Sequence, residues 1–408
     1  MLVQTTTANT GSAATSQTSY GCDAAPHNVQ QTATRIERLT SSPVREILSV
    51  ANRSDIISFA GGLPDQASFP ALTLDDTDIS VLQYGASEGE EDLREWIAED
   101  MRSRDLPVTA SQILILSGSQ QGIDLVAKMF IEPQALVAVE SPTYLAALQV
   151  FGLFGASYLS FRPGSYQSLA SAKPVMTYCI PTFQNPTGYC YTQAQRIQLA
   201  NICEANGSVL FEDDPYRDLV YGDCDRQPVC SYMEQGNWIY QSSFSKTLAP
   251  GLRLGYLACS PSLYPVLSRL KQAADLHSNR LSQQLVLSLL TRTDYRQRLT
   301  RVTAAYREKR DYFDSLLQQY FVDLADWARP DGGLFFWLKL AANIDTRGLL
   351  QRAIANGVAF MPGEPFYPED NNDGSYIRLN FSHASARDSA VGLKILAELI
   401  KAESVGNN

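Results

Sequence analysis

Residues 242–256 read SSFSKTLAPGLRLGY. Apolar runs lie on either side of this stretch, at 238–241 and 255–259, and both are expected to be strands. Lys246 is surrounded by hydroxyl residues, and Arg253 follows it along the chain. A lysine amine is a nucleophile only when it is neutral or already bound as an imine, and hydroxyls with an arginine suit a bound phosphate. The stretch therefore favours a Schiff base to pyridoxal phosphate, with a solvated surface loop as the alternative.

The composition limits the class of protein. The 408 residues suffice for two domains, and 45% hydrophobic with 19% charged residues is ordinary for a globular enzyme. A net charge of −10 argues against a nucleic-acid surface, and no apolar run approaches the ~20 residues of a membrane span. Seven cysteines without a CxxC pair and three scattered histidines favour neither zinc nor a disulfide framework. We expect a cytoplasmic protein without metal, nucleic-acid or membrane partners.

The apolar pattern predicts an α/β fold. Between about 85 and 260, short apolar runs alternate with amphipathic stretches, which is typical of a mostly parallel sheet covered by helices on both faces. The later helical and strand-like runs predict a smaller α+β domain. The expected strands are 113–116, 136–139, 175–180, 209–211, 238–241, 256–259, 334–340, 358–361 and 376–381, and the expected helices are 44–50, 92–101, 261–274, 282–291, 300–320 and one ending at 401.

Polar residues follow successive expected strands, and in parallel sheets ligands bind at the carboxyl ends of the strands. The first strand is followed by a small-residue turn with Ser119 and Gln120, which opens a helix whose N-terminus can hold a phosphate. The second is followed by Tyr144, whose ring can stack on a flat cofactor. The third is followed by Asn185, whose amide can donate to a phenolate-like oxygen. A helix cap, a core tyrosine and a plain turn are the alternatives.

Charged side chains lie at or just after two later expected strands, 209–211 and 376–381. Asp213 can pair with a protonated ring nitrogen, which makes a cofactor an electron sink, and Tyr216 can hydrogen-bond the same oxygen as Asn185. Arg378 lies inside an otherwise apolar expected strand, where its guanidinium needs a partner such as a bidentate carboxylate. The alternatives are an acidic turn, a metal site that no histidine supports, and a structural salt bridge.

From about 35 to 400 the chain resembles the class I/II aminotransferases, which are fold type I pyridoxal phosphate enzymes. Within them it is most similar to the branch of 2-aminoadipate and multisubstrate aminotransferases, which is related to the effector domains of MocR-type regulators. The resemblance rests on SFAGGLPDQASFP, YGASEGEEDLRE, SGSQQGIDL, ESPTY, PTFQNPTG, EDDPYRDL, SFSKTLAPGLRLGY and IRLNFS, in this order. It implies a large domain with a mostly parallel sheet between helices, and a smaller α+β domain.

The resemblance also implies a role for each site residue. Lys246 is expected to bind the cofactor as a Schiff base and to shuttle the substrate proton, while Arg378 holds the substrate α-carboxylate. Asp213 is expected to pair with the pyridine nitrogen. Further cofactor contacts are implied for Asn185 and Tyr216 (ring hydroxylate), Tyr144 (ring face), Ser119, Gln120, Ser243 and Arg253 (phosphate), and Ser245 as a weaker phosphate candidate.

Two implied residues concern assembly and substrate. Tyr84 matches a tyrosine that in this family reaches the phosphate of the neighbouring subunit, which implies a homodimer with shared active sites. Arg45, three residues after Ser42, matches an arginine that reaches the pocket in this branch and recognises a distal carboxylate. An exposed arginine on an amphipathic helix is the alternative.

The expected divisions are a disordered polar tail (1–32), a segment contributing to the small domain, dimer and active site (33–84), the large cofactor-binding domain (85–260), and linking helices with the small domain (261–408).

The implied reaction moves an amino group, by ping-pong chemistry, from an L-amino acid to a 2-oxo acid such as 2-oxoglutarate. The expected donors are 2-aminoadipate, glutamate, and apolar or aromatic amino acids. Another fold type I enzyme, such as a C–S or β-lyase, is one alternative. A non-catalytic MocR-like sensor is the other, and the polar segment before the expected cofactor domain lacks the basic clusters of a DNA-binding domain.

Overall fold

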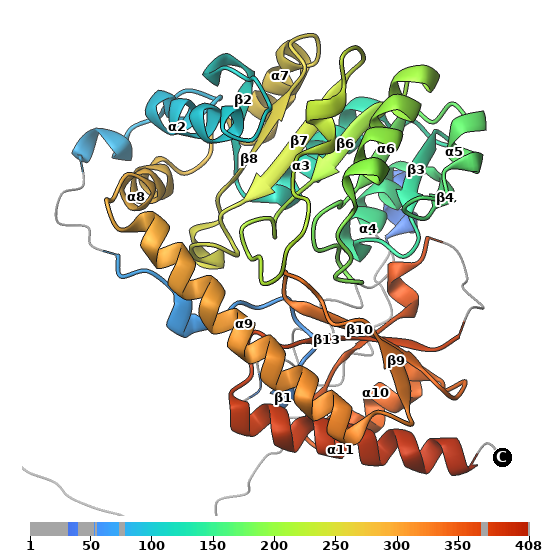
Figure 1. Cartoon of the computed structure of the whole chain (residues 1–408). Coiled ribbons are helices and arrows are strands. Elements are labelled where there is room, and N and C mark those ends of the chain that lie inside the picture. Colours follow the sequence, from blue (N-terminus) through green and yellow to red (C-terminus); the bar gives the residue numbers. More distant parts are fainter. Residues whose placement is uncertain (1–31, 40–52, 54, 73–77, 369–373, 407–408) are drawn as a thin grey trace, which may run out of the picture.

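The computed structural model describes residues 32–39, 53, 55–72, 78–368 and 374–406. Its larger part is built on a seven-stranded sheet (Figure 1). The strands are β2 (Ile113–Leu116), β3 (Leu136–Glu140), β4 (Ser157–Phe161), β5 (Met176–Cys179), β6 (Val209–Asp213), β7 (Trp238–Ser243) and β8 (Gly255–Cys259). Their spatial order is β2-β8-β7-β6-β5-β3-β4, and β8 alone runs in the direction opposite to the other six strands. The prediction of a mostly parallel sheet is confirmed.

Helices cover both faces of this sheet, because each turns one apolar stripe toward it. In α2 (Glu91–Arg102), for example, Leu93, Ile97 and Met101 recur at helical spacing and are buried. With α2, helices α6 (Gln193–Asn206) and α8 (Arg280–Leu290) pack on one face, and α3 (Ser119–Phe130), α4 (Leu145–Phe154) and α7 (Tyr264–Asp275) pack on the other. The short helix α5 (Gln167–Ser171) joins the first group.

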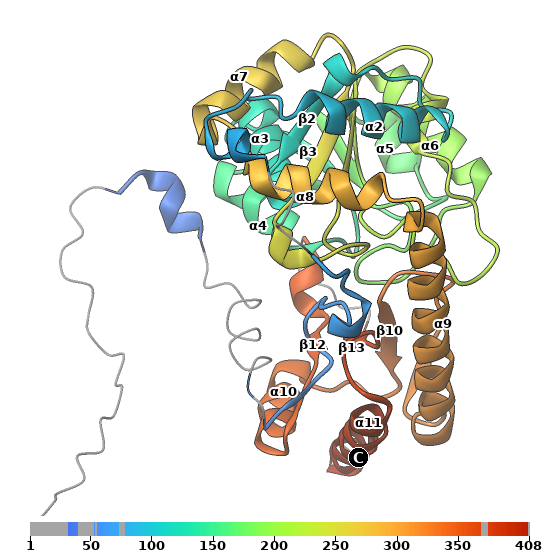
Figure 2. The ribbon, with the colours of Figure 1, turned by 90° about the vertical axis from the view of Figure 1, so that its left-hand side faces the viewer.

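The smaller part contains two sheets around a second apolar core. An antiparallel sheet has the order β12-β13-β10-β9, with β9 (Ala325–Trp327), β10 (Phe335–Leu340), β12 (Met361–Pro362) and β13 (Tyr376–Asn380). A parallel pair joins β1 (Ile57–Ser58) to β11 (Val358–Ala359). Helices α10 (Thr346–Ala355) and α11 (Ala386–Gly406) pack against these strands. The blue segment of residues 55–72 runs among these C-terminal elements (Figure 2).

One expected strand was wrong in its extent. The run 358–361 was predicted as a single strand, but it is two strands that pair with different partners, β11 with β1 and β12 with β13. Phe360 lies between them and is fully buried, so the whole run is apolar and its pattern does not mark the change of sheet.

Helix α9 (Tyr295–Tyr320) connects the two parts (Figures 1 and 2). It begins five residues earlier than the expected 300–320. Its later turns bury Tyr306 and Phe313 in the smaller core. Among the described helices, none has both the length and the apolar character needed to span a bilayer. The expected tail 1–32 falls almost wholly outside the described residues, as does the expected helix 44–50.

Candidate active site

Asp213 is the last residue of β6 and is buried. Its Oδ2 accepts a hydrogen bond from the Tyr178 hydroxyl at 2.8 Å, and its Oδ1 accepts one from Gln241 Nε2 at 3.1 Å. Burial raises the pKa of Asp213 to about 6, although these two hydrogen bonds act in the opposite direction. Within the described part of the chain it has no cationic partner. A buried carboxylate in this setting fits a cationic N–H group, such as a protonated pyridine nitrogen.

Lys246 lies just after β7 and is half-buried. Its Nζ donates a hydrogen bond to the carbonyl of Gly62 at 2.7 Å. Burial lowers the pKa of Lys246 to about 8, and the nearby positive charges of Arg378 and Arg253 contribute in the same direction. A lowered pKa leaves part of the amine neutral near physiological pH, which a nucleophile and general base requires.

Arg378 lies on β13 of the smaller part and reaches the larger part. Its Nη1 donates to Asn185 Oδ1 at 2.7 Å and its Nη2 to the Ala60 carbonyl at 2.6 Å. Phe335 and Phe366 flank the guanidinium, 4.1 and 4.9 Å from its carbon. Burial lowers the pKa of Arg378 to about 10, so it stays charged at neutral pH.

The partners of Arg378 leave a place for a ligand. Its buried Nε has no hydrogen-bond partner, and no ion pair to a described carboxylate is present. The alternative of a structural salt bridge is therefore not what the described residues show. Asn185 also hydrogen-bonds Tyr216, whose pKa burial raises. The arrangement fits a substrate carboxylate at Nε, close to a ring contacted by Asn185 and Tyr216.

A cradle for an anion forms where α3 begins. Gly118, just before the helix, has φ of +86°, and a Cβ on it would lie 2.6 Å from Arg253 Nη2. A Cβ on Gly255 would lie 3.1 Å from the main-chain nitrogen of Ser119, so both glycines permit close approach of the chain. The first turn of α3 has no side-chain cap; the Gln121 N–H donates to the Gly118 carbonyl, and the N–H groups of Ser119 and Gln120 are left for a ligand.

Two serines complete this cradle. Ser243 pairs with Gly255 across β7 and β8, and its Oγ lies 2.9 Å from the Oγ of Ser245. Within the described residues, Arg253 has no carboxylate partner; its side chain donates to the Pro250 carbonyl at 3.3 Å. Hydroxyls, a guanidinium that pairs with no described carboxylate, and a helix N-terminus suit a phosphate dianion. Gln120, the second residue of α3, is half-buried beside them.

The other predicted residues lie differently. Tyr144, which precedes α4, has its pKa raised to about 12 by burial, and the negative charge of Asp213 contributes in the same direction. Tyr84 is 77% exposed and packs its ring edge-on against His277. Arg45 lies outside the described residues. Among the residues that are described, no cluster of His, Cys, Asp and Glu side chains is arranged to hold a metal ion.

Residues 57–394 match the family described as Aminotransferase class I and II. The chain belongs to this family. The aminotransferase is 34% identical to Aromatic-amino-acid aminotransferase 1 of Thermococcus litoralis, over 90% of this chain and 93% of that protein. It is also 34% identical to the 2-aminoadipate transaminase of Thermus thermophilus, over 89% and 95%.

Solved structures agree with this family. LysN, an alpha-aminoadipate aminotransferase from Thermus thermophilus, was solved in complex with N-(5′-phosphopyridoxyl)-L-leucine. The aminotransferase superposes on it with a TM-score of 0.83 at 33% identity, covering 91% of this chain and 97% of that one. The fold and the pyridoxal phosphate cofactor predicted from the sequence are confirmed. The predicted relation to regulators is also confirmed, since YisV, an uncharacterized HTH-type transcriptional regulator of Bacillus subtilis, is 30% identical over 89% of this chain and 77% of its own length.

Several contacts of the aminotransferase site were not predicted. Tyr178 and Gln241 donate to Asp213, and the carbonyls of Ala60 and Gly62 accept from Arg378 and Lys246. Gln241 offered a signal, because it is the polar residue that directly follows the apolar residues 238–240 of β7. A main-chain carbonyl carries no such signal, because every residue has one.

Proposed function

We propose that the chain transfers amino groups between an L-amino acid and a 2-oxo acid such as 2-oxoglutarate, with both substrates using one site in turn. The proposed donors are 2-aminoadipate or glutamate, and apolar or aromatic amino acids. The observation that carries the proposal is the combination, in one site, of a buried carboxylate that pairs with no cation of the described residues, a lysine of lowered pKa and an arginine with an unpaired Nε. The names of the two relatives, an aromatic-amino-acid and a 2-aminoadipate transaminase, support the donor classes.

Each proposed role follows from a contact. Bound pyridoxal phosphate supplies the electron sink that makes the Cα proton of an amino acid acidic. Lys246, with its lowered pKa, takes this proton and returns it. Asp213 holds the ring nitrogen protonated through its buried carboxylate. Arg378 orients the α-carboxylate through its unpaired Nε. Asn185 and Tyr216 would bind the ring hydroxylate, and Tyr144 would stack on the ring face. The phosphate would be held by Ser119, Gln120, Ser243, Ser245 and Arg253.

We propose that two copies of the chain form the active unit. Exposed apolar side chains gather around Tyr84: Ile79 is 80% exposed, Leu82 is 71% exposed and Leu276 is 53% exposed. Arg280 donates to the carbonyls of Ser80 and Gln83, so these segments lie side by side. A second copy would cover this surface and bring Tyr84 to its partner's phosphate.

Subunit mixing tests the shared site. If Tyr84 serves the neighbouring subunit, a Lys246→Ala copy mixed with a Tyr84→Ala copy forms hybrids in which one site has both residues. The mixture should then regain activity that neither variant has alone. A mixture no more active than its parts, together with a monomeric sedimentation coefficient, would exclude the dimer with shared sites.

Arg45 is proposed to recognise a distal carboxylate. The expected effect of Arg45→Ala is a KM for 2-aminoadipate raised about tenfold, the effect of losing one charged hydrogen bond, with the KM for leucine unchanged. An unchanged KM for 2-aminoadipate would remove Arg45 from the site.

The six described cysteines are free, which supports the proposal that the protein acts in the cytoplasm.

Visible spectroscopy tests the reaction itself. The absorption of the bound cofactor should be bleached by 2-aminoadipate, glutamate, leucine or phenylalanine added singly, and should return when 2-oxoglutarate is added. An amino acid that releases pyruvate without reversible bleaching would identify a β-lyase. A spectrum that no amino acid changes would favour a ligand sensor.

A further inference from the structure

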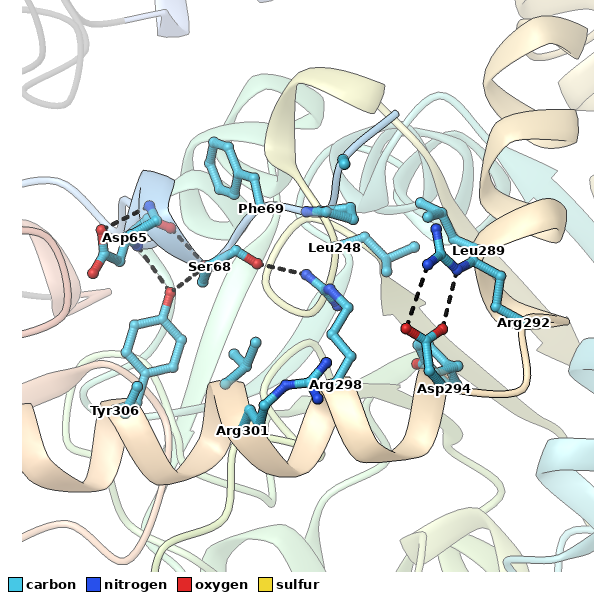
Figure 3. Close-up of a pocket in the computed structure, with 16 residues that line it drawn as sticks. Asp65, Ser68, Phe69, Leu248, Leu289, Arg292, Asp294, Arg298, Arg301 and Tyr306 are labelled. Atoms are coloured by element: carbon cyan, nitrogen blue, oxygen red, sulfur yellow. Dashed lines mark hydrogen bonds and ion pairs between the residues drawn. The ribbon is translucent and has the colours of Figure 1, made fainter. Parts of the chain in front are cut away.

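Arg298, in the first turns of α9, contacts two segments that are distant in the sequence. Its Nη1 donates to the carbonyl of Thr247 at 2.9 Å, and its Nη2 donates to the carbonyl of Ser68 at 2.6 Å. Figure 3 shows the guanidinium pointing from α9 toward Ser68 across a cavity of about 460 Å³. One side chain therefore joins the segment that carries Lys246 to residues 60–68, called the N-terminal segment below.

Arg298 and the amine of Lys246 connect the same two segments of the chain. Thr247 follows Lys246 directly in the chain, so the hydrogen bond from Arg298 to its carbonyl fixes the main chain one residue after the reactive lysine. Six residues before Ser68 lies Gly62, whose carbonyl accepts the hydrogen bond from Lys246 Nζ. Arg298 therefore hydrogen-bonds the same two segments that meet at the amine of Lys246.

The N-terminal segment also reaches the substrate side of the site. The carbonyl of Ala60 accepts a hydrogen bond from Arg378 Nη2. Residues 60–68 therefore contact both Lys246 and Arg378, the residue proposed to bind the substrate carboxylate. Helix α9 holds this segment at further points, because the main-chain nitrogen of Asp65 donates to the Tyr306 hydroxyl and its carboxylate pairs with Lys309 at 2.7 Å. Lys309 also donates to the Ser382 carbonyl, but neither of these two α9 residues hydrogen-bonds the Lys246 segment, which Arg298 reaches as well.

The environment of Arg298 matches such a task. It is half-buried, burial lowers its pKa, and no carboxylate among the described residues forms an ion pair with it. Its neighbour Arg292 is instead paired with Asp294, 3.0 Å away (Figure 3). The Arg298 guanidinium donates its hydrogen bonds to main-chain carbonyls, and such charge-assisted hydrogen bonds are stronger than neutral ones.

We propose that Arg298 is a positioning residue, which sets the place of Lys246 Nζ relative to residues 60–68 and so couples the lysine to the substrate-carboxylate side of the site. This inference rests on the proposed function for its meaning, but its geometry does not. When Arg298 is lost, residues 60–68 separate from the Lys246 segment, water reaches the amine, and the substrate carboxylate is held less well.

The test compares Arg298→Met and Arg298→Lys with Arg301→Met as the matched control. Arg301 lies on the same helix and lines the same cavity (Figure 3). The first readout is the pH dependence with which acetic anhydride labels Lys246 in the cofactor-free protein, measured by mass spectrometry. The second is the KM and kcat of the holoenzyme for 2-aminoadipate. Thermal unfolding shows that each variant is folded.

In Arg298→Met, the pKa of the Lys246 amine should rise by about one unit toward its ordinary value, because burial is the largest cause of its lowering. Arg378 and Arg253, the charges that also lower this pKa, remain in the variant. The KM should rise about tenfold, with a smaller change in kcat. Arg298→Lys, which keeps a cationic donor, should lie between wild type and Arg298→Met, and Arg301→Met should match wild type.

A labelling curve for Arg298→Met that coincides with that of Arg301→Met would overturn the proposal. If Arg298→Met does not fold, Arg298→Lys decides: wild-type labelling and KM would refute the positioning role. The labelling experiment needs no turnover, so its result stands if the reaction proves to be another one. Loss of the transaminase proposal and loss of the Arg298 proposal are thereby distinguished.

Discussion

The hydroxyl of Tyr178 is expected to set the pKa of Asp213, the carboxylate that we propose binds the cofactor ring. It donates to Asp213 Oδ2 at 2.8 Å, and both side chains are buried. Tyr178→Phe removes this hydrogen bond but keeps the ring, which packs 5.5 Å from Phe151 and 5.3 Å from Phe211 between centroids. A hydrogen bond to a charged group contributes about 1.5–3 kcal/mol, or about one to two pKa units. The pKa of Asp213, already about 6, should therefore rise to roughly 7–8 in the variant.

The sign of the effect on cofactor binding follows from the charge. The proposed partner of Asp213 is a protonated ring nitrogen, which needs the carboxylate, so affinity for pyridoxal phosphate should fall as the pH drops through this pKa. Wild type should lose affinity below about pH 6, and Tyr178→Phe already below roughly pH 7–8.

The assay is a titration of each cofactor-free protein with pyridoxal phosphate, followed by absorbance over a range of pH. Tyr158→Phe is the control, because its hydroxyl donates to the Leu148 carbonyl and not to Asp213. The reasoning is refuted if the midpoint of the pH dependence is the same in wild type and in both variants.

Three further outcomes are expected. Lys246→Ala should lose several orders of magnitude in turnover while its unfolding temperature stays near that of wild type, and near-normal turnover would reject the lysine as the catalytic base. Arg378→Lys keeps the charge but loses the planar fork, so the KM for every amino donor should rise tenfold or more; an unchanged KM would show that the carboxylate binds elsewhere. Burial raises the pKa of Glu140 from 4.5 to about 8, so its contribution to stability is present at low pH and is lost as pH rises through this window. Unfolding temperatures of wild type and Glu140→Gln should accordingly diverge between pH 4.5 and 8, to the disadvantage of wild type, whereas parallel curves would contradict the shift.

The strands of the large sheet were predictable because most are buried on both faces and therefore read as continuous apolar runs. β4 was missed for the opposite reason: Ser157 to Phe161 mixes serines with large residues at the sheet edge, and most of it is half-buried. The run 358–361 was read as one strand, since apolar character shows that a segment is buried but not which neighbour it pairs with.

Candidate site residues could be selected from the sequence where a polar side chain interrupts or follows an apolar run, as with Asp213 and Arg378. Their supporting contacts were not. Tyr178 reads as a core residue, and its hydroxyl meets Asp213 only because of the parallel register between β5 and β6. Arg298 reads as one of several arginines on α9, and its acceptors are carbonyls that no residue type announces.

The pairing of β1 with β11 has a consequence for how the chain is made. Ile57 aligns with Val358, and Asn380 donates its main-chain N–H to the Phe59 carbonyl. A ribosome releases the first of these strands long before the last, so the smaller core cannot close until nearly the whole chain has emerged. The large sheet, whose strands lie between them in the sequence, can form earlier. During that interval Ile57 and Phe59 lack their final neighbours, so this short N-terminal strand stays unpaired while the rest of the chain is synthesised.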